Sequence, residues 1–149
     1  MKALVVYDSA YGNTEKIAKA IGGAITGDVK VLRVSEVDPS ELKTINLFII
    51  GSPTYGGGPT PAIRGFLKKV PESSLQGIKV AAFDTRLSTR MVKILGYAAG
   101  KIASSLKKKG ANLIAEPEGF FVEGGKGPLK EGELERAIAW VKGIVERKN

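Results

Sequence analysis

The chain of 149 residues contains neither cysteine nor histidine. Without cysteine it has no disulfide bond, no thiolate nucleophile and no thiolate metal site. Without histidine it has no Ser-His-Asp triad, no Cys-His pair and no imidazole metal ligand. No apolar run approaches the roughly 20 residues of a transmembrane helix, and the run between Lys2 and Asp8 is too short for a signal peptide. These absences predict a cytoplasmic protein that neither crosses a membrane nor uses thiol or imidazole chemistry.

The composition is that of an ordinary globular domain. Hydrophobic residues make up 43% of the chain and charged residues 26%, and the length allows a sizeable core. The sequence contains no internal repeat and no linker-like segment. We therefore expect a single domain over residues 1–149.

The net charge of +8 is concentrated in one third of the chain. Residues 59–110 carry eleven basic and two acidic side chains, whereas the segments before and after are close to neutral. The excess indicates either a basic surface that attracts an acidic partner or a solvated face that keeps the protein soluble. Nucleic acid is not expected, because no binding motif is present and few aromatic residues lie among the basic ones.

Apolar runs and helical spacings alternate along the chain. Runs typical of buried or half-buried strands cover residues 2–7, 29–34, 47–50, 79–83 and 112–115, the last resuming at 120–122. Helical spacing covers about 14–25, 62–70 and 131–147, with a further helix that ends at 107–110 and begins near Ser88 or Gly96. Five alternations of strand and helix predict an α/β fold with a doubly wound parallel sheet.

Residues 9–14 read Ser-Ala-Tyr-Gly-Asn-Thr and connect the first predicted strand to the first predicted helix. The first N–H groups of a helix lack internal partners, and the helix dipole is positive there. Gly12 permits a backbone conformation that other residues resist, and Thr14 is expected to be the N-cap. The turn therefore predicts an anion site that contains neither lysine nor arginine.

Two more segments follow the ends of predicted strands. Residues 51–61 are the richest in glycine and proline, and they place Tyr55 beside three glycines. Asp84, Thr85 and Arg86 come at the end of the strand predicted at 79–83. In open α/β sheets the ligand lies outside the carboxyl ends of the strands, so we expect these segments to converge with residues 9–14. A phosphate site beside an aromatic ring is typical of a site for a mononucleotide with a planar ring.

These two motifs resemble those of flavodoxins. Residues 9–14 are similar to the flavodoxin phosphate loop, and residues 51–56, Gly-Ser-Pro-Thr-Tyr-Gly, are similar to the second flavin loop. With the alternation of strands and helices, the resemblance covers essentially the whole chain. It implies a flavodoxin-like three-layer sandwich, a five-stranded parallel sheet of order 2-1-3-4-5 with helices on both faces. It also implies FMN as cofactor and a function in electron transfer.

The resemblance further implies which residues contact FMN. The implied phosphate contacts are Ser9, Ala10, Tyr11, Gly12, Asn13 and Thr14. The implied isoalloxazine contacts are Pro53, Thr54, Tyr55, Gly56, Gly57, Asp84, Thr85 and Arg86. Tyr55 is expected to stack on the ring, and a glycine beside it to allow a peptide flip. No catalytic side chain and no metal ligand are predicted.

The chain departs from the usual flavodoxin pattern because it is basic and has no aromatic residue after Arg86 in its third loop. Leu87 or Arg86 could cover the second face of the flavin, or the face could stay open to a substrate. Arg86 could favour the reduced flavin anion or form an ion pair with Asp84. We expect an acidic partner at a rim formed by Arg64, Arg86, Arg90 and Lys93, with the lysines at 107–109 at the opposite end of the sheet.

An electron carrier has two alternatives. The first is a small NAD(P)H- or quinone-dependent FMN reductase on the same fold, which the open third loop and the basic rim would permit. The second is a non-flavin module such as a receiver domain, which is disfavoured because Asp8 has no adjacent acidic residue. The sequence makes no prediction about the oligomeric state.

Overall fold

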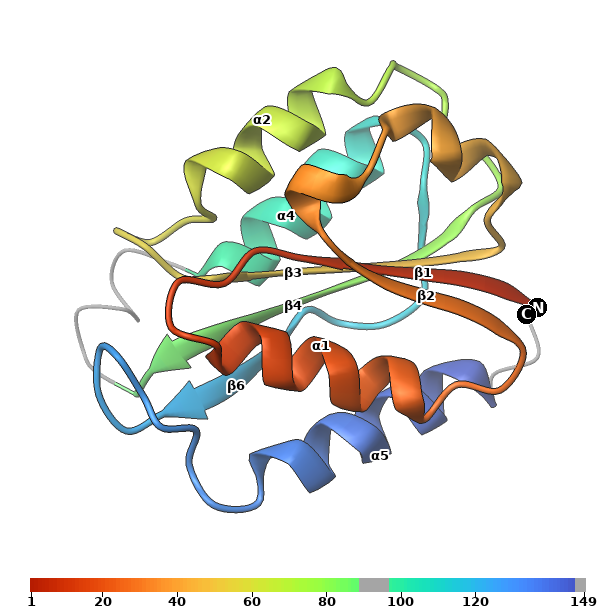
Figure 1. Ribbon diagram of the computed structural model, residues 1–149. Coiled ribbons are helices and arrows are strands. Elements are labelled where there is room, and N and C mark those ends of the chain that lie inside the picture. The colour runs from red at the N-terminus through yellow and green to blue at the C-terminus, as the bar shows by residue number, and fades with distance from the viewer. Residues whose placement is uncertain (89–96, 147–149) are drawn as a thin grey trace.

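The computed structural model describes residues 1–88 and 97–146, and within them six strands form one parallel sheet (Figure 1). The sheet has the order β2-β1-β3-β4-β5, and β6 also pairs with β4. The strands are β1 (Lys2–Tyr7), β2 (Asp28–Arg33), β3 (Leu47–Pro53), β4 (Lys79–Leu87), β5 (Asn112–Leu113) and β6 (Glu118–Val122). The order of the five predicted strands is confirmed, and the resumed strand at 120–122 is the separate short β6.

Helices cover both faces of this sheet, which gives three layers (Figure 1). One face carries α1 (Asn13–Gly23) and α5 (Glu133–Val145), and the other carries α2 (Pro61–Lys69) and α4 (Ala98–Lys108). Two short 3-10 helices, Val34–Glu36 and Pro39–Thr44, connect β2 to β3. Within the described parts of the chain, no helix is long and apolar enough to span a membrane.

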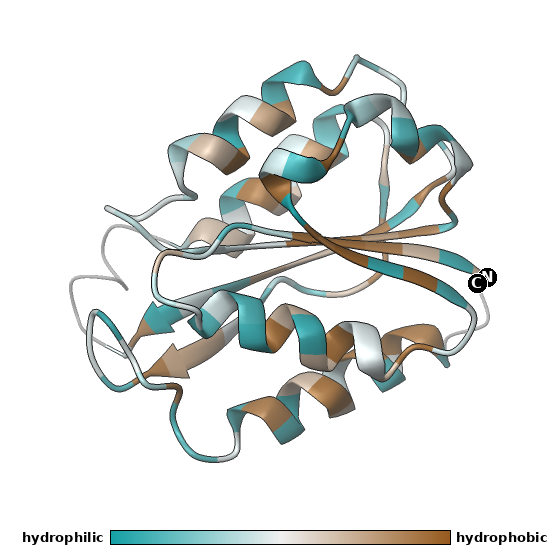
Figure 2. Cartoon of the chain, viewed as in Figure 1, coloured by the Kyte–Doolittle hydropathy of each residue, from teal (hydrophilic) through white to brown (hydrophobic). Residues whose placement is uncertain are grey.

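The central strands are apolar on both faces because both faces are covered. In β3, Phe48 and Ile50 are buried in the core under α2 and α4, whereas Leu47 and Ile49 are buried in the core under α1 and α5. Figure 2 shows the hydrophobic strands between helices whose outer sides are hydrophilic. The edge strand β2 is only partly buried, which agrees with its alternating sequence.

Strand β4 extends further than the sequence predicts. It runs to Leu87, so Asp84, Thr85 and Arg86 belong to a strand and not to a loop. Neighbouring strands on both sides of β4 explain the extension. On one side, Ser52 of β3 pairs with Asp84. On the other side, the two-residue β5 pairs only with residues 79–80, and β6 pairs with residues 83–87. The polar side chains are therefore held on a rigid element.

The start of α1 also differs from the prediction. The helix begins at Asn13, and Gly12 is its N-cap, with φ of 91°. This left-handed conformation suits glycine, so Thr14 already lies within the first turn. Two positions, Ser88 and Gly96, were predicted as possible starts of the next helix. The described part of α4 begins at Ala98, and Gly96 lies outside the described residues, so neither start is tested in full. The predicted rim residues Arg90 and Lys93 also lie outside the described residues.

Candidate functional site

The chain leaves β1, β3, β4 and β6 at the same end of the sheet, the carboxyl end (Figure 1). A cleft opens there. It is lined by Ser9, Ala10, Tyr11, Asn13, Thr14, Pro53, Thr54, Tyr55, Thr85, Arg86, Leu87, Val122 and Gly125. The three segments singled out in the sequence therefore converge. Of the predicted contact residues, Gly12, Gly56, Gly57 and Asp84 do not line the cleft.

The first turn presents free backbone donors at one end of the cleft. The first helical hydrogen bond of α1 runs from the N–H of Lys16 to the carbonyl of Gly12, at 3.1 Å. The N–H groups of residues 13–15 precede it and so have no acceptor within the helix. The Gly12 N–H is donated to Ser9 Oγ at 3.0 Å, which fixes the shape of the turn. This arrangement can bind a phosphate without a cation in the loop.

Arg33, at the end of β2, supports this turn from outside. Its Nη1 donates to the Ser9 carbonyl at 3.0 Å, and its guanidinium lies 3.7 Å from carboxylate oxygens of Asp8 and of Glu15. Asp8 in turn accepts the Ser9 N–H at 3.0 Å and the Thr60 hydroxyl at 2.6 Å. Arg33 was not among the predicted site residues, and the only signal for it in the sequence is its position near the carboxyl end of a predicted strand.

The second segment forms a tight turn that presents Tyr55. The Tyr55 N–H donates to the Gly58 carbonyl at 2.8 Å, and the Gly58 N–H donates back at 3.0 Å. Gly56 and Gly57 have φ of 55° and 83°, so both central residues are left-handed, as a type I′ turn requires. Glycine takes both conformations without strain, and apart from Asn and Asp few other residues adopt them.

Two tyrosine rings are exposed at the cleft. Tyr11 is 55% exposed and Tyr55 is 45% exposed, in contrast to the buried aromatic residues of the core. Burial raises the pKa of the Tyr55 hydroxyl, and the charges of Tyr11 and Asp8 raise it further. The phenol therefore stays neutral at physiological pH. A flat ligand would find two aromatic faces here.

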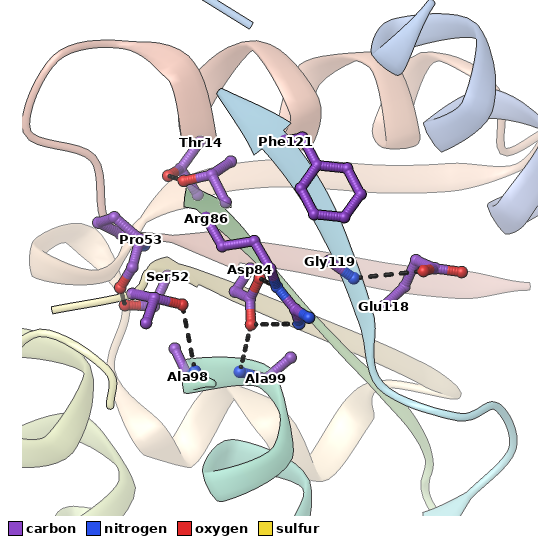
Figure 3. A network of polar contacts seen from close by, with 12 residues as sticks. Thr14, Ser52, Pro53, Asp84, Arg86, Ala98, Ala99, Glu118, Gly119 and Phe121 are labelled. Atoms are coloured by element: carbon purple, nitrogen blue, oxygen red, sulfur yellow. Dashed lines mark hydrogen bonds and ion pairs between the residues drawn. The ribbon is translucent and has the colours of Figure 1, made fainter. Parts of the chain in front are cut away.

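Beneath the cleft, Asp84 and Arg86 form a two-pronged ion pair (Figure 3). Arg86 Nε lies 2.7 Å from Asp84 Oδ1, and Nη2 lies 2.8 Å from Oδ2. The same Oδ2 accepts the N–H of Ala99, in the first turn of α4, at 2.9 Å. Asp84 is fully buried, and burial raises the pKa of its carboxyl, while Arg86 and Ala99 oppose the shift. The ion-pair interpretation of Arg86 is thus confirmed.

The guanidinium of Arg86 lies close to both Tyr97 and Gly119. Its Cζ is 3.4 Å from the centroid of the Tyr97 ring, a stacked cation–π contact. On Gly119 of β6, a side-chain carbon would overlap the guanidinium (Figure 3). The Arg86 side chain is 13% exposed, so it contributes to the cleft wall but is held from several sides.

The end of β6 and the loop after it complete the cleft, through Val122 and Gly125 respectively. Asn13 donates its side-chain amide to the Lys126 carbonyl at 3.2 Å, and Gly127 leaves room for that amide, since an added carbon would lie 2.6 Å from it. Leu87 also lines the cleft, and whether it covers the second face of the flavin stays a prediction. Val122 and Gly125 were not predicted as site residues. Glycines at 124, 125 and 127 after an apolar strand are nevertheless a signal of the same kind as the glycine-rich residues 51–61.

Comparisons with known proteins decide the family. The sequence profile described as Flavodoxin matches residues 5–140. The chain belongs to the flavodoxin family. Flavodoxins bind FMN, so the predicted family and its cofactor are confirmed.

Individual flavodoxins are similar in sequence and in structure. The chain is 34% identical over 88 residues to "Probable flavodoxin 1" of Bacillus subtilis, an alignment that covers 56% of each protein, so the chain spans about half the length of that curated relative. A solved flavodoxin from the domain Archaea is 27% identical, with a TM-score of 0.82 over 98% of this chain and 97% of that one. Oxidised Flavodoxin 2 from Bacillus cereus is 25% identical, with a TM-score of 0.84 over 98% and 99%.

Proposed function

We propose that this flavodoxin holds FMN in the cleft between the three converging segments and carries electrons between proteins. The observation that carries the proposal is the pairing of free helix N–H groups at one end of the cleft with two exposed tyrosine rings. FMN itself supplies the redox chemistry when bound. The chain then has to bind, orient and shield the cofactor. None of these tasks requires cysteine or histidine, the two residue types that the chain lacks.

The first turn has the donor set that a phosphate monoester requires. The N–H groups of residues 13–15 point along the axis of α1, where the helix dipole favours an anion. Ser9 and Thr14 add hydroxyl groups at the cleft wall. Arg33 holds the turn through the Ser9 carbonyl and two carboxylates, so its charge is largely balanced. In this proposal the phosphate is bound by dipoles in a fixed arrangement.

The other end of the cleft suits a flat heteroaromatic ring. Tyr55 offers an aromatic face, and Leu87 and Val122 offer apolar surface. The peptide between Gly56 and Gly57 is flanked by two residues without a side chain, so it can rotate at little steric cost. We therefore keep the proposal that a glycine peptide beside Tyr55 reorients when the charge state of the ligand changes.

Arg86 acts in this proposal as a positioned wall residue and not as a free cation. Its two-pronged contact with Asp84 offsets most of its charge. The effect of Arg86 on the reduced flavin is therefore smaller than the sequence alone suggested. Asp84 contributes through Arg86, because its own side chain has no exposed surface.

Flavodoxins transfer electrons to redox partners, and we propose that the partner of this one is acidic. The helices α2 and α4 carry Arg64, Lys68, Lys69, Lys101, Lys107 and Lys108 and no acidic residue. A field of one sign accelerates the approach of a partner of the opposite sign. Binding that does not weaken with added salt would contradict this part of the proposal.

A small FMN reductase remains the second candidate. What favours it is that β4 contributes no aromatic side chain to the cleft within the described residues, so a substrate ring could reach the flavin. Apoprotein titrated with FMN, followed by flavin fluorescence and absorbance, tests the cofactor site. We expect stoichiometric binding, and no sustained oxidation of NADPH by the loaded protein alone. Sustained oxidation would favour the reductase, and failure to bind FMN would remove both.

A further inference from the structure

The helices α2 and α4 lie side by side (Figure 1). Between them, outside the FMN cleft, is a basic groove. Its walls are formed by Pro59, Arg64, Leu67, Lys68, Lys101, Ser105 and Lys109, and we refer to it as the α2–α4 groove. Neither helix contains an acidic residue. None of the ion pairs found in the described part of the chain involves a cation of this groove. Four cations thus share one groove without a counter-charge from either helix.

The cations at the two ends of the groove are held in place. Arg64 donates Nε–H to the Pro59 carbonyl at 3.0 Å, and Lys109 donates its ammonium to the Val70 carbonyl at 2.8 Å. Because carbonyl oxygens orient these side chains without cancelling their charge, the groove is preorganised for an anion. Lys109 follows the end of α4 and lines the same groove as Arg64, at the end away from the cleft. This place agrees with the expectation that the lysines at 107–109 lie at the opposite end of the sheet.

The groove is continuous with the turn that carries Tyr55. The guanidinium of Arg64 occupies the space beside Gly58 that a side chain would fill, and Lys101 Cδ comes within 3.5 Å of the same position. Both helices begin at the cleft: Thr60 caps α2, and the Ala98 N–H at the start of α4 donates to Thr54 Oγ1 at 3.2 Å. The positive ends of both helix dipoles therefore face the cleft end of the groove.

We infer that the α2–α4 groove docks an acidic, extended segment of the redox partner and brings it against the Tyr55–Gly58 turn. The electron-transfer part of this inference rests on the proposed function. Lys68 and Lys101 pair with carboxylates of the segment, Leu67 and Pro59 contact its apolar side chains, and Arg64 marks the end nearest the flavin. The partner thus docks beside the cleft and leaves its opening free.

An acidic protein segment fits the groove better than nucleic acid does. The nine residues of α2 make a wall only about 13 Å long. The groove residues include no aromatic side chain on which bases could stack. The apolar floor next to the cations is the mixture that docking sites for amphipathic peptides show. Duplex DNA is therefore used as the competing probe.

The test measures binding of a fluorescently labelled oligoglutamate peptide to the apoprotein by anisotropy. The double variant Lys68→Glu/Lys101→Glu is compared with Lys16→Glu/Lys142→Glu, which makes the same charge change at exposed positions on α1 and α5. We expect the groove variant to weaken peptide binding about ten-fold or more and the control variant by less than about three-fold. Equal losses in the two variants would mean that only net charge matters and would overturn the inference. Tighter binding of a DNA duplex than of the peptide, lost in the groove variant, would overturn it as well.

The same proteins titrated with FMN separate the two proposals. Both double variants are expected to keep the FMN affinity of the parent protein, because neither changes a cleft residue. If FMN binds and the peptide does not, the groove inference fails alone. If the peptide binds through the groove and FMN does not bind, the proposed function fails and the acidic docking site stands without its redox role.

Discussion

The side-chain oxygens of Thr14 and Thr85 lie 2.8 Å apart, although the two residues are 71 positions apart in the sequence. The hydrogen bond is buried and joins the first turn of α1 to β4. It therefore links the end of the cleft that suits a phosphate to the strand that carries Arg86. Both residues line the cleft, so this contact helps to fix its shape.

The first prediction concerns this bond. Thr85→Val removes one hydroxyl and leaves the other buried without its partner, so we expect the free energy of unfolding of the apoprotein to fall by about 1–3 kcal/mol. Urea denaturation measures the change. In a double-mutant cycle with Thr14→Val, the two losses should be less than additive, and strict additivity would show that the hydroxyls do not interact.

The second prediction concerns Gly119. A methyl group there overlaps the Arg86 guanidinium, so Gly119→Ala should displace Arg86 and leave the buried Asp84 carboxylate poorly paired. We expect a loss of about 2–4 kcal/mol in unfolding free energy. Gly143→Ala is the matched control, because nothing lies within 4 Å of the added carbon and alanine favours the helix. A loss of equal size in the control would refute the explanation.

The third prediction concerns acid stability and Glu133. This carboxylate accepts the Phe121 N–H at 2.7 Å and pairs with Arg136, also at 2.7 Å, and Arg136 lowers its pKa below the usual 4.5. A lowered pKa in the folded state gives stability that is present above the unfolded value and is lost as the pH falls through the folded one.

Glu133→Gln should therefore lower stability at neutral pH by about 1–2 kcal/mol and flatten the fall in stability below about pH 4.5. Thermal melts across the acid range measure this. Glu135→Gln, at an exposed position of the same helix, should leave the profile close to that of the parent. The idea fails if both variants keep the same acid slope.

The fourth prediction concerns Tyr55 and FMN. Tyr55→Ala should weaken FMN binding by about ten-fold, because stacking of aromatic rings contributes about 0.5–1.5 kcal/mol beyond the area buried. Tyr55→Phe keeps the ring and should bind within about two-fold of the parent. Fluorescence titration of the apoprotein compares them. Equal weakening by both changes would assign the role to the hydroxyl instead.

The fifth prediction concerns the charge of the Asp84–Arg86 pair. Asp84→Asn keeps an oxygen for the Ala99 N–H but removes the charge that offsets Arg86. The reduction potential of the bound flavin should then become more positive, because an uncompensated cation at the cleft wall favours the reduced, more negative cofactor. Spectroelectrochemical titration measures the shift. A potential that moves the other way would exclude an electrostatic effect of Arg86.

Much of the fold and two parts of the site could be predicted because their signals are local. Apolar runs mark the strands, and the polar or glycine-rich residues that follow two of them, 9–14 and 51–61, are contiguous in sequence. Parallel topology then brings these segments to one end of the sheet. Strand ends, together with the rule for where ligands bind in such sheets, are therefore enough to place these two parts of the site.

What could not be predicted depends on contacts between distant segments. Asp84 to Arg86 resemble a loop in the sequence, and they form a strand because β6 pairs with them from more than thirty residues away. Whether Arg86 forms an ion pair or stays free depends on how deeply the Asp84 carboxylate is buried beside it. The sequence does not give that burial. The support from Arg33 and the wall at Val122 likewise arise only when β2 and β6 lie beside the cleft.

Three glycines near the cleft each leave room for the polar head of a side chain from another element. Gly58 makes room for Arg64, Gly119 for Arg86 and Gly127 for the amide of Asn13. At these positions even alanine intrudes on a group that positions the binding surface. In a saturation-mutagenesis scan, Gly119 and Gly127 should tolerate as few replacements as a core residue such as Phe48, although they bury almost no apolar area of their own. Gly58 should tolerate more, because the exposed end of the Arg64 side chain can move aside.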